Sequence, residues 1–180
     1  RYHSPNVGTL PPIRFVTTAD GVRIAYCLHG DGPPLVYVRG WATHLEITWE
    51  EDAYQAFFEQ LAGHMRVVRF DARANGLSER TLERLDLDGL TADVEALMDG
   101  LGIAEANIWG SAFGAPIAIT YAARHPERVS KLILDGAYAT MKDQGTEAAR
   151  ESFRSMLVAM RGQPDAVNAS FAYMQDPDSS

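Results

Sequence analysis

Cysteine and long apolar runs are both scarce in this sequence, and each shortage narrows the class of protein. Cys27 is the only cysteine, so no disulfide can form within the chain, and we expect its thiol to be buried in a strand. No apolar run approaches membrane-spanning length, and no signal peptide is visible. We therefore predict no membrane partner and, by default, a cytoplasmic location. The chain begins with Arg1 rather than Met, which is typical of a processed product or of a piece of a longer polypeptide.

Positively charged residues and residues with metal-ligand spacing are also scarce. The 16 Lys and Arg residues face 24 Asp and Glu residues, and the net charge of −8 disfavours nucleic acid as a partner. No group of His, Cys, Asp or Glu has metal-ligand spacing, and no glycine-rich loop fits a phosphate, so we predict neither a metal nor a cofactor. The 180 residues, 46% of them hydrophobic, suffice for one ordinary domain with a core.

The order of the remaining patterns predicts an α/β fold. From residue 35 onward, short β-rich runs alternate with amphipathic stretches of helical spacing. Strands are expected at 35–38, 66–70, 107–110 and 131–134, and helices at 53–63, 87–101 and 115–124. This alternation predicts a mainly parallel, doubly wound sheet with helices on both faces. Ahead of it, 14–18 and 22–29 flank the turn signal Asp20-Gly21 and predict an antiparallel hairpin at one edge of the sheet.

The segment Gly110-Ser111-Ala112-Phe113-Gly114 carries the most specific chemical signal. It has the frame of a nucleophile elbow, G-x-S-x-G, in which the chain turns sharply from a strand into a helix. Alanine occupies the central position, where the nucleophilic serine belongs, and Ser111 stands in the variable position, from which we expect it to point elsewhere. The chain thus has the frame of a serine hydrolase without its reactive oxygen.

Five landmarks over roughly residues 14–140 resemble the α/β-hydrolase fold superfamily, and its serine hydrolases and esterases in particular. They are Asp20–Tyr26, Leu35–Trp41 at the third strand and oxyanion loop, Asp71–Ser78 (similar to D-x-R-G-x-G-x-S), the elbow, and His125–Val129 followed by Leu132–Asp135. The stretch Trp41–Glu46 with Trp49 further resembles hydrolase domains found beside nucleotide-cyclase or transcription-regulator modules. Besides Ala112, two positions depart from the pattern: Arg39 stands where the family usually has His, and Ala74 replaces a usual glycine.

The resemblance implies where the parts of a reactive site lie. Position 112 is the nucleophile position, and the backbone N–H groups of Trp41 and Phe113 are the expected oxyanion donors. The candidates for a substrate pocket are Gly40, His44 and Ser111.

The other triad members are expected outside this chain. The triad follows the order Ser, acid, His, and no histidine follows Asp135, so we expect the acid and the base beyond Ser180. Asp135 itself stands where some relatives carry the acid, and a turn or cap-hinge role is the alternative. Residues 1–13 are interpreted as a lead-in or linker, 14–140 as the N-terminal part of the hydrolase core, and 141–180 as the start of a truncated helical cap.

Two functions remain open at this point. The first is a serine hydrolase that acts on a carboxylic ester or a similar small acyl substrate, here inactive because of Ala112. The second is a non-catalytic, hydrolase-like module that binds or senses a ligand. The alanine is either engineered or natural, and the undamaged glycines favour engineering. A second chain, or the C-terminal segment of a longer protein, is expected to complete the fold.

Overall fold

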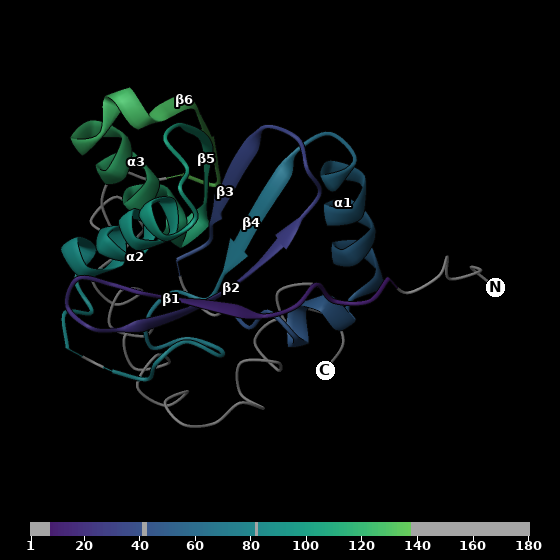
Figure 1. The fold of residues 1–180 in the computed structure, drawn as a ribbon, viewed down its shortest axis with the longest axis horizontal. Helices are drawn as coiled ribbons and strands as arrows, with labels where there is room; N and C mark the ends of the chain where they lie inside the picture. Colours follow the sequence, from purple (N-terminus) through teal and green to yellow (C-terminus); the bar gives the residue numbers. More distant parts are fainter. Residues whose placement is uncertain (1–7, 41–42, 82, 138–180) are drawn as a thin grey trace, which may run out of the picture. The chain divides into compact units, whose positions relative to one another are not determined.

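The computed structural model describes residues 8–40, 43–81 and 83–137, which form a six-stranded sheet with helices packed on it (Figure 1). The strands are β1 (Arg14–Thr17), β2 (Arg23–His29), β3 (Pro34–Val38), β4 (Arg66–Phe70), β5 (Ala106–Ser111) and β6 (Val129–Asp135). The helices are α1 (Asp52–Ala62), α2 (Leu87–Gly100) and α3 (Ala115–Arg124), with 3₁₀ turns at Ile47–Glu50, Ala112–Gly114 and Pro126–Arg128.

The sheet order is β1-β2-β4-β3-β5-β6, and it confirms the predicted fold class. β1 pairs with β2, and β2 with β4, in antiparallel fashion, whereas β4, β3, β5 and β6 are mutually parallel. Every strand and helix expected from residue 14 to residue 135 is present, with its ends within two residues of the expected ones. The expected lead-in falls largely outside the described residues, and the expected cap wholly so. No helix among the described residues combines the length and apolar character that crossing a bilayer requires.

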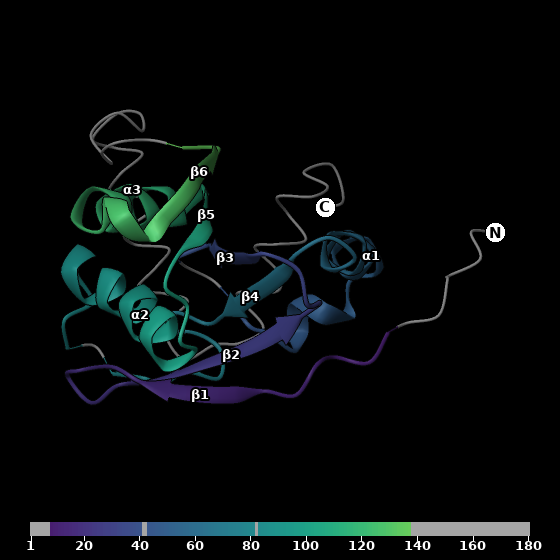
Figure 2. The same ribbon diagram turned by 45° about the horizontal axis from the view of Figure 1, so that its top comes forward.

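Helices cover both faces of the sheet because its inner strands are apolar on both sides (Figures 1 and 2). On one face, Val36 of β3 and Val68 of β4 pack in a large core with residues of α2 and α3. On the other face, Leu35 and Val67 pack against α1 and the turn before it. Neighbouring residues of a strand thus face opposite layers, as the two-residue period of a strand requires.

A buried ion-pair cluster fixes the loop that follows β4. The guanidinium of Arg73 is fully buried and binds two carboxylates: its Nε donates to Asp93 Oδ1 of α2 (2.9 Å), and its Nη1 donates to Asp20 Oδ2 of the β1–β2 turn (2.8 Å). The backbone N–H of Arg73 donates to Asp93 Oδ2. The hydrogen bonds from Arg73 and Thr18 hold the pKa of Asp20 far below its usual range. Three segments distant in sequence are therefore joined at one buried cation.

The loop beyond Arg73 contains Ala74, which stands where the family usually has a glycine, and its backbone is strained there. Ala74 has a φ of +63°, a left-handed conformation that residues other than glycine rarely adopt. A glycine there would relieve strain of about 1–2 kcal/mol. The surrounding contacts, among them the Ala74 N–H donating to Glu79 O, hold the backbone in this conformation despite the strain.

Strand β6 forms the open edge of the described sheet. Its side chains Leu132, Ile133 and Leu134 are 38%, 44% and 40% exposed, so apolar groups on both faces meet solvent in the described part of the chain. Parallel strands are normally buried on both faces, and among the described residues this edge lacks such cover.

Candidate functional site

The bend expected at Ala112 is present at the carboxyl end of an inner strand. β5 lies between β3 and β6, ends at Ser111, and passes through the 3₁₀ turn Ala112–Gly114 directly into α3. Ala112 has a φ of +47°, a strained conformation for alanine, and its side chain is exposed. Residues held in such conformations by their surroundings cluster at functional sites. The methyl group of Ala112 is therefore presented to the outside and not packed in a core.

The two elbow glycines are required by close packing. A Cβ built on Gly110 would lie 2.6 Å from Ala118 Cβ of α3, and one built on Gly114 would lie 1.8 Å from Val38 O of β3. Neither space admits a methyl group, because non-bonded carbon atoms need about 3.5–4.0 Å. The glycines thus let strand, bend and helix pack together, which explains their spacing without reference to catalysis.

Gly114→Ala is accordingly expected to lower the free energy of unfolding by at least about 1–3 kcal/mol. The reason is that the new methyl group would have to displace the backbone of β3. Gly63→Ala is the matched control: Gly63 caps α1 at a φ of −64°, and a Cβ there would meet only Gln60 O at 3.2 Å. Denaturant unfolding of both variants measures the difference. A Gly114→Ala variant as stable as Gly63→Ala would show that the elbow is not closely packed.

The segment after β3 touches the elbow. Gly40 has a φ of +80°, and a Cβ built on it would lie 2.7 Å from Phe113 O. The structure therefore brings together Gly40 and Phe113, two of the residues singled out from the sequence. Trp41, the other expected oxyanion donor, lies outside the described residues.

Ser111 points away from the bend, toward the neighbouring strand. Its Oγ donates to Asp135 Oδ2 (3.1 Å), and Trp109 Nε1 donates to Asp135 Oδ1 (2.6 Å). The Tyr37 hydroxyl lies beside Ser111; burial raises the pKa of Tyr37 more than this neighbour lowers it. Sequence reasoning named Ser111 and Asp135 separately but missed the contact between them and the part of Trp109 and Tyr37 in it.

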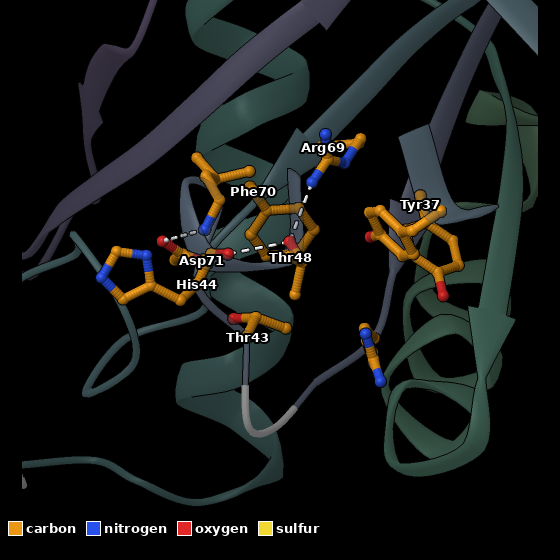
Figure 3. Close-up of a pocket in the computed structure, with 10 residues that line it drawn as sticks. Tyr37, Thr43, His44, Thr48, Arg69, Phe70 and Asp71 are labelled. Atoms are coloured by element: carbon orange, nitrogen blue, oxygen red, sulfur yellow. Dashed lines mark hydrogen bonds between the residues drawn. The ribbon is translucent and has the colours of Figure 1, made fainter. Parts of the chain in front are cut away.

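His44 is one of the residues that line a pocket, together with residues of β3, of β4 and of the segment 43–48 (Figure 3). Its Nδ1 accepts from Ile47 N (3.4 Å), while the buried carboxylate of Asp71 accepts from the backbone N–H groups of Leu45 (3.2 Å) and Leu77 (2.9 Å) through Oδ2. Burial raises the pKa of Asp71. Within the described part of the chain, the geometry shows no hydrogen bond to the other carboxylate oxygen of Asp71, Oδ1. The pocket thus ties the segment after β3 to the end of β4.

Arg69 is the residue of this pocket that sequence reasoning missed. Its side chain is 2% exposed and packs against aromatic rings, with its guanidinium carbon 4.9 Å from the Trp49 ring centroid and 4.8 Å from that of Tyr54. Its Nη2 donates to Thr48 Oγ1 (3.1 Å), which Figure 3 shows as a dashed line, and Thr48 Oγ1 in turn donates to the His44 carbonyl (2.8 Å). A charged residue within the apolar run 67–70 was the available signal. The buried cation helps to hold the loop in place.

His29 lies beside Arg69, and this contact predicts a pH dependence of stability. Burial, with a further contribution from Arg69, lowers the pKa of His29 from 6.5 to about 4. Between these values the unfolded chain takes up a proton that the folded chain does not, so stability is lost as pH falls from 6.5 to 4, by roughly 3 kcal/mol in the limit. His29→Phe, which keeps a ring against Trp49 but cannot titrate, is expected to flatten this part of the stability–pH curve. Urea unfolding between pH 4 and pH 8 measures it, and an unchanged slope would contradict the assignment.

The fold and the bend together define a structural class of protein. It is an α/β sheet in which a sharp turn places residue 112 at the carboxyl ends of the strands. Open α/β sheets bind their ligands at this edge. Among the described residues, no three His, Cys, Asp or Glu side chains are placed to hold a metal ion.

Comparison with known proteins agrees with this class. Residues 33–169 match the family model described as the alpha/beta hydrolase fold, and the chain belongs to that family. It is 35% identical over 126 residues to a bifunctional esterase/perhydrolase of Acinetobacter calcoaceticus, covering 68% of this chain and 44% of that enzyme.

Two solved structures extend the comparison. A hydrolase from Pseudomonas aeruginosa superimposes with a TM-score of 0.72 at 25% identity, covering 95% of this chain and 64% of the other. The bottromycin epimerase BotH, solved in complex with bottromycin A2, superimposes with a TM-score of 0.66 at 28% identity, covering 84% of this chain and 57% of that one. The chain spans about half the length of the curated relatives it matches.

Proposed function

We propose that this chain carries the acyl-binding part of a carboxylic ester hydrolase site in which alanine occupies the position of the nucleophile. The observation that carries the proposal is the left-handed φ of +47° at Ala112, a residue that has no steric reason to adopt it. An elbow uses this strain to expose its central side chain at the top of the sheet. The esterase/perhydrolase relative supports the substrate class.

The oxyanion hole of this site would survive the loss of the serine. Its donors are backbone N–H groups, assigned to Phe113 and Trp41, and replacement of a side chain does not remove them. The N-terminus of α3, which follows the bend directly, favours negative charge there. The chain as it stands would bind a carbonyl or carboxylate oxygen without turning the ligand over.

A crystal of the protein soaked in a short-chain carboxylate tests this proposal. The expected result is ligand density with one carboxylate oxygen beside the Phe113 N–H, on the side of Gly40. Absence of density there at saturating carboxylate, in a crystal whose elbow is open to solvent, would count against an oxyanion hole.

The second candidate function is a ligand-binding or non-hydrolytic module. One observation favours it: the likeness to a protein that is named an epimerase, not a hydrolase. The elbow glycines favour neither function, because close packing by itself requires them. The codon for residue 112 in the natural gene separates the two. Serine there supports the hydrolase, and alanine supports the module.

The partner and location assignments fit either function, whereas the triad residues belong to the hydrolase alone. The partner would be a small-molecule acyl ligand, and the exposed edge of β6 would be covered by further chain or by a second polypeptide. The acid and the base of a triad are expected in that remainder. The cytoplasmic location stays a prediction.

A further inference from the structure

Asp135 carries a carboxylate that no step of the proposed site uses. It lies at the end of β6, is exposed, and accepts a hydrogen bond on each oxygen, from Trp109 Nε1 (2.6 Å) and from Ser111 Oγ (3.1 Å). No Lys or Arg within the described ranges 8–40, 43–81 and 83–137 forms an ion pair with it. Two neutral donors therefore fix the orientation of the carboxylate without neutralising its charge.

The carboxylate lies directly beside the elbow. Asp135 is the register partner of Ser111 across the parallel β5–β6 pair. The chain then passes the bend, because a Cβ built on Gly136 would lie 3.8 Å from Ala112 Cα. Adjacent strands are about 4.8 Å apart, so the backbone of Asp135 lies about one strand spacing from that of Ser111, the residue before position 112.

This carboxylate has room for another donor. An ionised carboxylate has about four acceptor positions, and Trp109 and Ser111 occupy two of them. The Tyr37 hydroxyl beside Ser111 extends the polar cluster away from the bend. A preorganised anion of this kind, with acceptor positions left, recognises a cationic or strongly donating ligand group.

We propose that Asp135 recognises a protonated amine on the carbon next to the ligand carbonyl, so that the site takes α-amino acyl compounds. The inference rests on the proposed function, because it places the carbonyl carbon over Ala112. An α-amino nitrogen is about 2.5 Å from its carbonyl carbon by standard bond geometry. A charge-assisted hydrogen bond adds about 2.8 Å. The carboxylate oxygen therefore has to lie within roughly 5 Å of the carbonyl carbon, a reach that the place of Asp135 on the strand next to the elbow allows.

Two ligands of equal size test the proposal on the full protein with Ala112 in place. N-benzyl-L-alaninamide and N-benzylisobutyramide differ by an ammonium in place of a methyl group. At pH 6.5, where an α-amino group is protonated, calorimetry is expected to show about 10- to 100-fold tighter binding of the alaninamide. Asp135→Asn is expected to reduce this preference to less than about threefold. Asp88→Asn, which removes another exposed carboxylate paired with Arg124, is the matched control and keeps the preference.

Each outcome decides a different question. Equal affinity of the two amides for the unmodified protein overturns the inference and leaves the acyl-binding proposal standing. Binding of neither amide overturns both. A preference that persists in Asp135→Asn places the amine elsewhere and overturns the inference.

A second measurement keeps the test independent of any variant. The indole N–H of Trp109 donates to the Asp135 carboxylate, so its NMR resonance reports on that group. The alaninamide is expected to shift this resonance and the isobutyramide to leave it in place. Equal shifts with both ligands would contradict the proposal even if Asp135→Asn failed to fold.

Discussion

Ala112→Ser in the full-length protein is expected to create, or restore, hydrolysis of 4-nitrophenyl butyrate at a rate at least about 10⁴-fold above that of the alanine form. The reason is that the triad acts as a unit, and without its nucleophile only binding and oxyanion stabilisation remain. The new Oγ would occupy the exposed position at the bend, where the φ of +47° directs the side chain outward. Release of 4-nitrophenolate measures the rate, and mass spectrometry after treatment with a fluorophosphonate probe detects the covalent adduct.

The control for this experiment is Ala104→Ser, which adds the same hydroxyl at an exposed position before β5. It is expected to give neither turnover nor adduct. If Ala112→Ser in a folded, full-length protein also gives neither, the hydrolase proposal fails and the ligand-binding module remains.

Arg73→Met is expected to be the most damaging substitution for stability, at a cost of about 3–5 kcal/mol near neutral pH. Methionine leaves the carboxylate of Asp93 buried without a counter-ion, and Asp93 is fully buried in α2. Burial already raises the pKa of Asp93 even with Arg73 in place. Without the arginine, the folded state would gain stability relative to the unfolded state as pH falls, because protonation removes the unpaired charge. Urea unfolding at pH 7 and at pH 5 measures both effects.

Arg84→Met is the matched control for this substitution. Arg84 lies 4.0 Å from the same Asp20 oxygen that Arg73 binds, but its side chain is 53% exposed. Its removal is expected to cost about 0–1 kcal/mol. Equal losses in the two variants would show that burial of the Arg73 cluster does not set its contribution.

The elements of the fold could be predicted because their signals are local. A short apolar β-rich run such as 35–38 and a helical stripe such as 87–101 depend on residues a few positions apart, and the structure places β3 and α2 there. The elbow followed from five consecutive residues, because only glycine fits where α3 and β3 approach the bend. Arg69 and Asp135 could not be assigned in the same way. Their partners Thr48, Tyr54 and Ser111 are distant in sequence, and their contacts exist only because β4, β3, β5 and β6 lie side by side.

The amino-acid sequence by itself determined the order of strands and helices, the antiparallel hairpin and the position of the sharp bend at Ala112, since apolar periodicity and glycine spacing act over a few residues. The tertiary structure alone decided that Ser111 binds Asp135, that Arg69 is surrounded by aromatic rings, and that Arg73 joins Asp20 to Asp93. The physical reason is that strand register and helix packing bring together side chains from distant parts of the chain. Their charges and hydrogen bonds then set the chemistry of the carboxyl edge.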